Sequence, residues 1–173
     1  HLITTASADQ PLKGTQHLIP AFAQLRTDFP DLKLTFIGKP KPDGDTAKLI
    51  ERYKLDEHID FRHGITTREI VELYASASVA VVPSEYEGFG NAFLEAVYFK
   101  KPLLINRYAI FVRDIEPKGF DLIVMDGYLT KKNVRQVREV LESPARWVQM
   151  TSHNYAVATR HYSYAMLRRQ LDN

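Results

Sequence analysis

The stretch "VVPSEYEGFGNAFLEAVYF", residues 81–99, contains the end of a strand, a loop and most of a helix. It opens with the last residues of the run "SVAVVP" (78–83), whose apolar character predicts a strand buried on both faces. After Asn91 the apolar residues recur at helical spacing. Acidic residues and glycines fill the loop between this strand and this helix. The sequence therefore predicts a strand–loop–helix unit with polar groups at the carboxyl end of the strand.

The same alternation of apolar runs and helical patterns extends along the chain. Strands are predicted at residues 2–6, 32–38, 58–64, 78–83, 102–106 and 121–125. Helices are predicted at 13–29, 45–55, 66–77, after residue 90, and from 131 onward with a break at Pro144. About six strands that alternate with helices predict an α/β fold, a doubly wound, Rossmann-like parallel sheet with helices on both faces.

Two helix starts carry local capping signals. Asp45 or Thr46 is predicted to be the N-cap of the helix at 45–55. The tripeptide "DGD" at 43–45 is interpreted as a turn and cap, not as a metal-binding Asp-x-Asp pair. Thr66, followed three residues later by Glu69, predicts a capping box.

Composition excludes several classes of function. The chain of 173 residues suits one domain, and its formal net charge of +2 gives no electrostatic case for binding nucleic acid. It has no cysteine, and its six histidines are dispersed, so no metal site is predicted. No apolar run approaches the roughly 20 residues of a membrane span, and no secretory signal is visible, so a cytoplasmic location is expected.

The glycine loop has the chemistry of an anion site. Gly88 and Gly90 are expected to allow tight backbone paths that a Cβ atom would block. The amides of Phe89, Gly90 and Asn91 would then be free at a helix start, where the helix dipole favours a phosphate.

Two glutamates flank these amides. Glu87 and Glu95 lie eight residues apart, and ionised carboxylates only accept hydrogen bonds. We therefore expect them to bind hydroxyl groups on either side of an anion. A sugar nucleotide offers a sugar hydroxyl, a diphosphate and a ribose hydroxyl in that order. Two glutamates eight residues apart also occur by chance. From the spacing alone, a pair without any function therefore remains an alternative. Glu85 is expected to be a solvated loop acid.

The stretch "PSEYEGFGNAFLEAVYFKKPLLIN" (83–106) resembles the signature of retaining GT-B glycosyltransferases of family four, in which a Glu-x7-Glu motif falls on Glu87 and Glu95. Residues 12–40, 61–84 and 154–171 resemble further segments of that family in the same order. The resemblance implies that residues 1–173 form the C-terminal, donor-binding half of a GT-B enzyme. The N-terminal acceptor domain would be absent from this chain, which would be inactive without it.

The resemblance also implies roles for individual residues. Glu87 would orient the donor sugar, Glu95 would bind the ribose, and Lys13 matches the family's phosphate-binding lysine. Further donor-binding positions are Gly88, Phe89, Gly90 and Asn91 in the loop, and His63, Gly64 and Ile65 where the base would be received.

The chain departs from the family pattern at two places. Relatives carry an arginine five or six residues before the lysine, where this chain has Ser7 and Ala8. Ser7 could donate one hydrogen bond, and Lys39 or Arg107 could replace the missing cation. The segment "NRYAIF" (106–111) stands where relatives have small, glycine-containing turns, so the donor's identity stays open.

The implied function is hexosyl transfer with retention, from a UDP-, GDP- or ADP-sugar to a sugar, glycoside or lipid-linked acceptor, with no metal or other cofactor. Peripheral attachment to the inner face of a membrane is compatible with such acceptors. Half of a sugar phosphorylase or of a sugar-nucleotide epimerase is the first alternative. The glutamate pair favours a transferase over an epimerase but not over a phosphorylase. A Rossmann-like nucleotide-binding module without catalysis is the second alternative.

Overall fold

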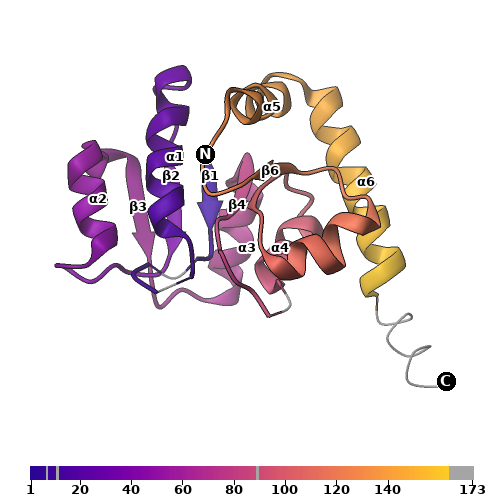
Figure 1. Ribbon diagram of the computed structural model, residues 1–173, viewed down its shortest axis with the longest axis horizontal. Coiled ribbons are helices and arrows are strands. Elements are labelled where there is room, and N and C mark those ends of the chain that lie inside the picture. Colours follow the sequence, from indigo (N-terminus) through magenta and orange to yellow (C-terminus); the bar gives the residue numbers. More distant parts are fainter. Residues whose placement is uncertain (7, 11, 89, 164–173) are drawn as a thin grey trace.

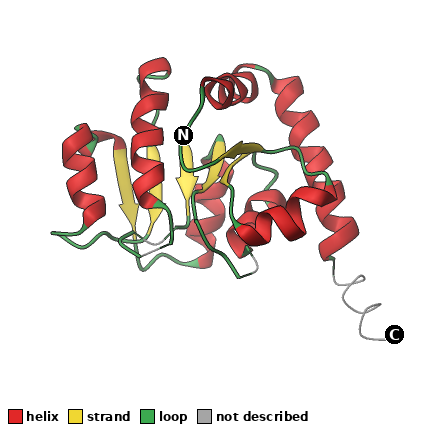
Figure 2. Ribbon diagram, viewed as in Figure 1, coloured by secondary structure: helices red, strands yellow, loops and turns green. Residues whose placement is uncertain are grey.

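The computed structural model describes residues 1–6, 8–10, 12–88 and 90–163; Ser7 and Phe89, both predicted site residues, lie outside the described residues. Six parallel strands form one sheet in the order β3-β2-β1-β4-β5-β6 (Figures 1 and 2). The strands are β1 (Leu2–Thr4), β2 (Leu34–Ile37), β3 (Ile59–Arg62), β4 (Val79–Val82), β5 (Leu103–Asn106) and β6 (Ile123–Met125). The predicted doubly wound sheet is confirmed.

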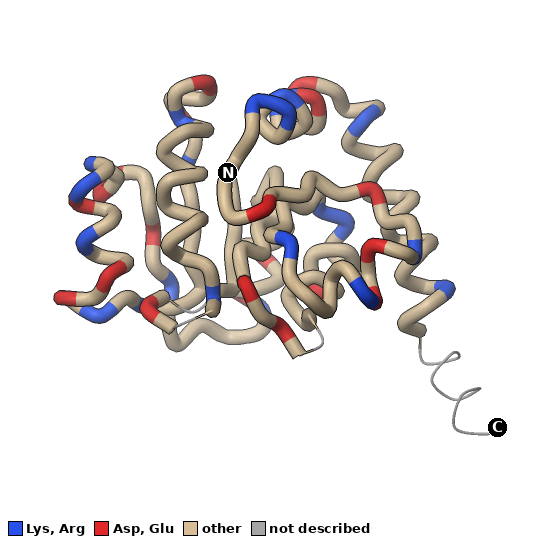
Figure 3. The backbone as a smooth tube through the Cα atoms, in the orientation of Figure 1, with Lys and Arg blue, Asp and Glu red and all other residues tan. Residues whose placement is uncertain are grey.

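The helices lie on both faces of this sheet (Figure 1). They are α1 (Thr15–Asp28), α2 (Asp45–Tyr53), α3 (Thr67–Ser76), α4 (Asn91–Tyr98), α5 (Lys131–Glu142) and α6 (Pro144–Tyr162). Shorter helical turns cover Asp56–His58, Phe111–Ile115 and Glu116–Lys118. Within the described residues no helix is both long and apolar enough to cross a bilayer. Acidic and basic residues are both distributed over the whole molecule (Figure 3).

Side-chain alternation along the strands builds two separate cores. Leu2 packs with α1, α2 and α5 on one face, and its neighbour Ile3 packs with α3 and α4 on the other. β4 and β5 are buried throughout, as parallel strands covered on both faces should be, whereas β3 at the edge is only half buried.

The strand order fixes where a ligand site can form. The chain builds β1, β2 and β3 outward on one side, then crosses back to place β4 beside β1. The connections that leave β1 and β4 therefore diverge to opposite faces. A crevice opens between them at the carboxyl ends of the two strands, as is usual at such a switch point.

A close backbone contact lies at this switch point. Gly14, the N-cap of α1, has φ 73°, and a Cβ atom there would lie 1.8 Å from the carbonyl oxygen of Pro83. The amide of Glu85 donates to the carbonyl of Leu12 over 2.9 Å. The turn before α1 and the loop after β4 therefore touch through their backbones.

The capping predictions had different outcomes. The capping box of Thr66 and Glu69 at the start of α3 is confirmed. The N-cap of α2 was predicted wrongly, because Gly44 occupies that position and no side chain caps it locally. Instead the carboxylate of Asp9, far away in the sequence, accepts a hydrogen bond from the amide of Thr46 over 2.8 Å.

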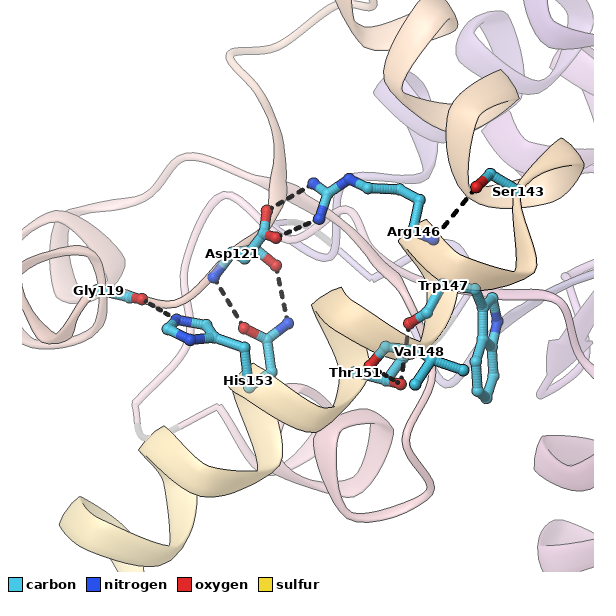
Figure 4. A network of polar contacts seen from close by, with 9 residues as sticks. Gly119, Asp121, Ser143, Arg146, Trp147, Val148, Thr151 and His153 are labelled. Carbon is cyan, nitrogen blue, oxygen red and sulfur yellow. Dashed lines mark hydrogen bonds and ion pairs between the residues drawn. The ribbon is translucent and has the colours of Figure 1, made fainter.

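The break at Pro144 is confirmed, and polar contacts fix the helix that follows it (Figure 4). Ser143 caps α6, and the Arg146 guanidinium binds both carboxylate oxygens of Asp121. The Asn154 side chain accepts from the amide of Asp121 and donates to its carbonyl, over 2.8 and 2.7 Å. His153 contacts the carbonyl of Gly119. The segment before β6 is thereby tied to α6.

We predict that Asp121→Asn lowers the free energy of unfolding by about 1–2 kcal/mol near neutral pH. Hydrogen bonds from Arg146 hold the pKa of Asp121 below its ordinary value of 3.8, so its stabilisation is present above that value and lost as the pH falls through the lowered one. Thermal melts at pH 7, 5 and 3 should show that the difference in melting temperature between the variant and the wild type becomes smaller as the pH falls. The exposed pair of Asp60 with Arg62 supplies the control, Asp60→Asn. A difference that does not change with pH would contradict the assignment.

We also predict that Gly14→Ala destabilises the fold by about 2–5 kcal/mol, because the new methyl group meets Pro83 and the left-handed backbone is strained. Gly119→Ala is the matched control: φ is 79°, but a Cβ atom meets nothing within 4 Å, so only about 1–2 kcal/mol is expected. Urea unfolding of both variants measures the difference. Equal losses would show that the contact with Pro83 contributes nothing.

Candidate functional site

A cavity of about 420 Å³ lies at the carboxyl ends of β1 and β4, a volume that suits part of a small-molecule ligand. Its polar lining comes from three places. Thr5 and Lys13 follow β1, Ser84 and Glu87 follow β4, and Asn91 and Glu95 belong to α4. The two glutamates that the sequence singled out therefore face one shared space.

Glu87 is held by two donors. The Lys13 ammonium donates to Glu87 Oε1 over 2.9 Å, and the Ser84 hydroxyl donates to the same oxygen over 2.7 Å. The Glu87 side chain is 17% exposed and that of Lys13 is 31% exposed, so water screens this ion pair only in part. The second oxygen, Oε2, has no hydrogen-bond partner in the part of the chain that the structure describes.

Glu95 lies one turn inside α4, and the Tyr74 hydroxyl lies 3.4 Å from its Oε2 atom. Burial, reinforced by the negative charge of Glu95, raises the pKa of Tyr74. The phenol therefore stays protonated and serves as a hydrogen-bond donor to the carboxylate. The side chain of Thr5 also contacts this hydroxyl.

The start of α4 has the features of an anion site. Its N-cap is Gly90, with φ 88° and no capping side chain, and both Gly90 and Asn91 line the cavity. The positive end of the helix dipole therefore faces the same space as the Lys13 ammonium. Gly88 also lines it, but the predicted steric need for glycine there was wrong. Its φ is not left-handed, and a Cβ atom would meet nothing within 4 Å.

Sequence reasoning missed Ser84, which lines the cavity, and Asn106, which binds the backbone of Ser84. Ser84 is buried, and its carbonyl accepts a hydrogen bond from the Asn106 side chain over 3.3 Å. Asn106 in turn accepts from the amide of Gly127 over 2.8 Å. The available signal was a polar residue at the end of an apolar strand, since "LLIN" ends in Asn106 and "SVAVVP" leads directly to Ser84.

Other predicted site residues lie outside this cavity. Lys39, His63 and Gly64 are exposed on loops, and Ile65 lines a different cavity beside Arg62 and Glu69. Arg107 is exposed and pairs with Glu116 over 3.1 Å. Contacts of these residues with a nucleotide stay predictions.

Glu85 differs from its prediction as a solvated acid. Its Oε1 atom accepts a hydrogen bond from the Gln16 side chain over 2.8 Å and lies 2.5 Å from His17 Nε2. Both partners lie in the first turn of α1. Glu85 therefore adds a side-chain link between this helix and the loop after β4.

The described residues contain no group of three or more histidine, cysteine, aspartate or glutamate side chains arranged to hold a metal ion. The polar atoms that face the cavity comprise one ammonium, two carboxylates, hydroxyls and the start of a helix. Together they can bind an anion with hydroxyl groups on both sides of it.

Similar proteins include the MMP α-(1→4)-mannosyltransferase of Mycolicibacterium hassiacum, which is 37% identical over 118 residues. That match covers 68% of this chain but only 28% of the relative, so the chain spans about a quarter of that protein's length.

Two solved structures share the fold. The C-terminal domain of the glycosyl transferase group 1 family protein LpcC from Francisella tularensis has a TM-score of 0.75 and 22% identity, with 95% of this chain and 87% of that chain covered. HepE from Anabaena in complex with UDP has a TM-score of 0.79 and 19% identity, with 99% of this chain and 47% of that chain covered. The family described as Glycosyl transferases group 1 matches residues 1–157, nearly the whole chain. The chain therefore belongs to that family.

Proposed function

We propose that this chain is the donor-binding domain of a retaining glycosyltransferase, which moves a hexose from a nucleotide-sugar to a sugar, glycoside or lipid-linked acceptor. One observation carries the proposal: Lys13, Glu87 and Glu95 line a single cavity at the start of α4. The acceptor domain would precede this chain, and transfer would need both. The likeness to a C-terminal domain crystallised on its own supports this division.

The diphosphate would lie at the start of α4. Negative charge grows on this leaving group as the bond to the sugar breaks, so fixed amides and the Lys13 ammonium would act where the charge develops. Lys13 has three N–H donors, of which Glu87 takes one. The ammonium can therefore bind phosphate oxygens as well. A neighbour that is bound to UDP supports a nucleoside diphosphate as the ligand.

The two carboxylates would bind the two ends of the donor. Glu87, held by Ser84, would accept from hydroxyl groups of the sugar, and Glu95, with Tyr74 behind it, would accept from the ribose. Hydrogen bonds to ionised carboxylates are stronger than neutral ones, so both contacts would orient the ligand. Retention at the anomeric carbon is the outcome that the family resemblance implies. A cytoplasmic location and attachment to an inner membrane face stay predictions from the sequence.

We predict that a nucleotide-sugar raises the melting temperature of the full-length protein. Binding to the folded state alone stabilises it by about 2.7 kcal/mol when the ligand is at 100 times its dissociation constant. A thermal-shift panel of UDP-glucose, GDP-mannose and ADP-glucose would identify the preferred base. If none of them, nor UDP, GDP or ADP, changes the melting temperature, the proposal fails. Release of sugar phosphate with inorganic phosphate as acceptor would instead identify a phosphorylase.

We further predict that Glu87→Ala abolishes sugar transfer by the full-length protein and that Lys13→Ala weakens donor binding. Loss of one such group typically costs on the order of 10²–10³ in rate. Steady-state kinetics with the preferred donor would measure both effects. Glu142→Ala is the matched control, because Glu142 also pairs with a basic residue, Arg138, but does not line the cavity. Normal kinetics for the Glu87 or the Lys13 variant would refute that residue's role.

A further inference from the structure

The hydroxyl of Tyr108 is a buried polar group without a partner. Tyr108 follows β5, the residue is 4% exposed, and its Oη atom has no hydrogen-bond partner among the residues that the structure describes. Its ring packs against Phe111, with 6.0 Å between the ring centroids. Buried hydroxyls in folded proteins are nearly always hydrogen-bonded, so an unpaired one points to a partner that arrives later.

This hydroxyl lies next to the donor cavity. A Cβ atom on Gly90 would stand 3.2 Å from Tyr108 Oη, so only the hydrogen of this glycine separates the phenol from the start of α4. Gly90 itself lines the cavity. Tyr108 Oη therefore lies beside a residue that itself lines the cavity, on the side where any other amino acid would carry its Cβ atom.

The charge of Glu87 acts on this hydroxyl. Burial, with a further contribution from the negative charge of Glu87, raises the pKa of Tyr108 to about 12. The phenol is therefore protonated at neutral pH and can donate a hydrogen bond. Glu87 has an oxygen to receive it, because Lys13 and Ser84 both bind Oε1 and leave Oε2 without a partner in the described structure.

We propose that Tyr108 is a positioning residue for Glu87, an inference that rests on the proposed function. When a diphosphate attracts the Lys13 ammonium, Glu87 loses part of its contact with that cation. The Tyr108 hydroxyl then donates to Glu87 Oε2 and keeps the carboxylate directed at the donor sugar. Tyr108 belongs to "NRYAIF" (106–111), the segment in which this chain departs from its relatives. The proposal thus gives a residue of this divergent segment a role in the site.

The first test compares Tyr108→Phe with wild type in the full-length protein. Phenylalanine keeps the ring and removes only the unpaired hydroxyl, so the melting temperature without nucleotide should stay the same or rise. The affinity for the nucleotide-sugar that binds best among UDP-glucose, GDP-mannose and ADP-glucose should fall about 10–100-fold, as measured by calorimetric titration. Tyr98→Phe, on an exposed tyrosine of α4, is the matched control and should change neither quantity.

A double-mutant cycle then tests whether Tyr108 acts through Glu87. Glu87→Gln removes the charge that the phenol would bind, so adding Tyr108→Phe to it should cost less than threefold in affinity. Losses that simply multiply would show that the two residues act independently and would overturn the inference. Unchanged affinity in Tyr108→Phe alone would overturn it too.

The two proposals fail in distinguishable ways. If Glu87→Ala loses transfer while Tyr108→Phe binds the donor as wild type does, the proposed function stands and the role of Tyr108 is refuted. If neither the three nucleotide-sugars nor UDP, GDP or ADP binds the wild-type protein, both are refuted.

Discussion

The backbone contact between the turn before α1 and the loop after β4 determines the geometry of the site. Gly14 lies against the carbonyl of Pro83, and Leu12 accepts hydrogen bonds from the loop that carries the acids. Only a residue without a side chain permits this approach. It brings the Lys13 ammonium within 2.9 Å of Glu87, although 74 positions separate the two residues in sequence.

Two side-chain links reinforce the contact. Glu85 binds Gln16 and His17 in the first turn of α1. The Asn106 side chain, at the end of β5, donates a hydrogen bond to the carbonyl of Ser84. The loop after β4 is therefore tied to α1 and to its own sheet at the two residues that lie two and three positions before Glu87. Such a loop presents its carboxylate in one orientation, which reduces the ordering that ligand binding would otherwise require.

The sequence predicted the sheet, the helices on both faces and the shared cavity of Glu87 and Glu95, because apolar periodicity and strand order constrain these features strongly. It failed where distant segments meet. Asp9 caps α2 across 37 positions of sequence, so the local signal at Asp45 and Thr46 was misleading. Glu85 looked solvated because nothing in its neighbourhood shows that α1 lies opposite. Tyr108 and Asn106 went unassigned for the same reason: their relation to Glu87 exists only after β5 has paired with β4.

The central position of β1 beside β4 has a consequence for how the polypeptide assembles. β1 pairs with β2 along one edge and with β4 along the other, where Leu2 lies opposite Val79. The second edge of β1 is therefore covered only by a segment nearly eighty positions downstream. Loop closure over such a separation is entropically costly and slow. During synthesis β1, β2 and β3 can associate as they leave the ribosome, but one edge of β1 stays open until β4 emerges. The cavity, which is lined by residues that follow both strands and by the start of α4, therefore cannot form until β4 and α4 have emerged.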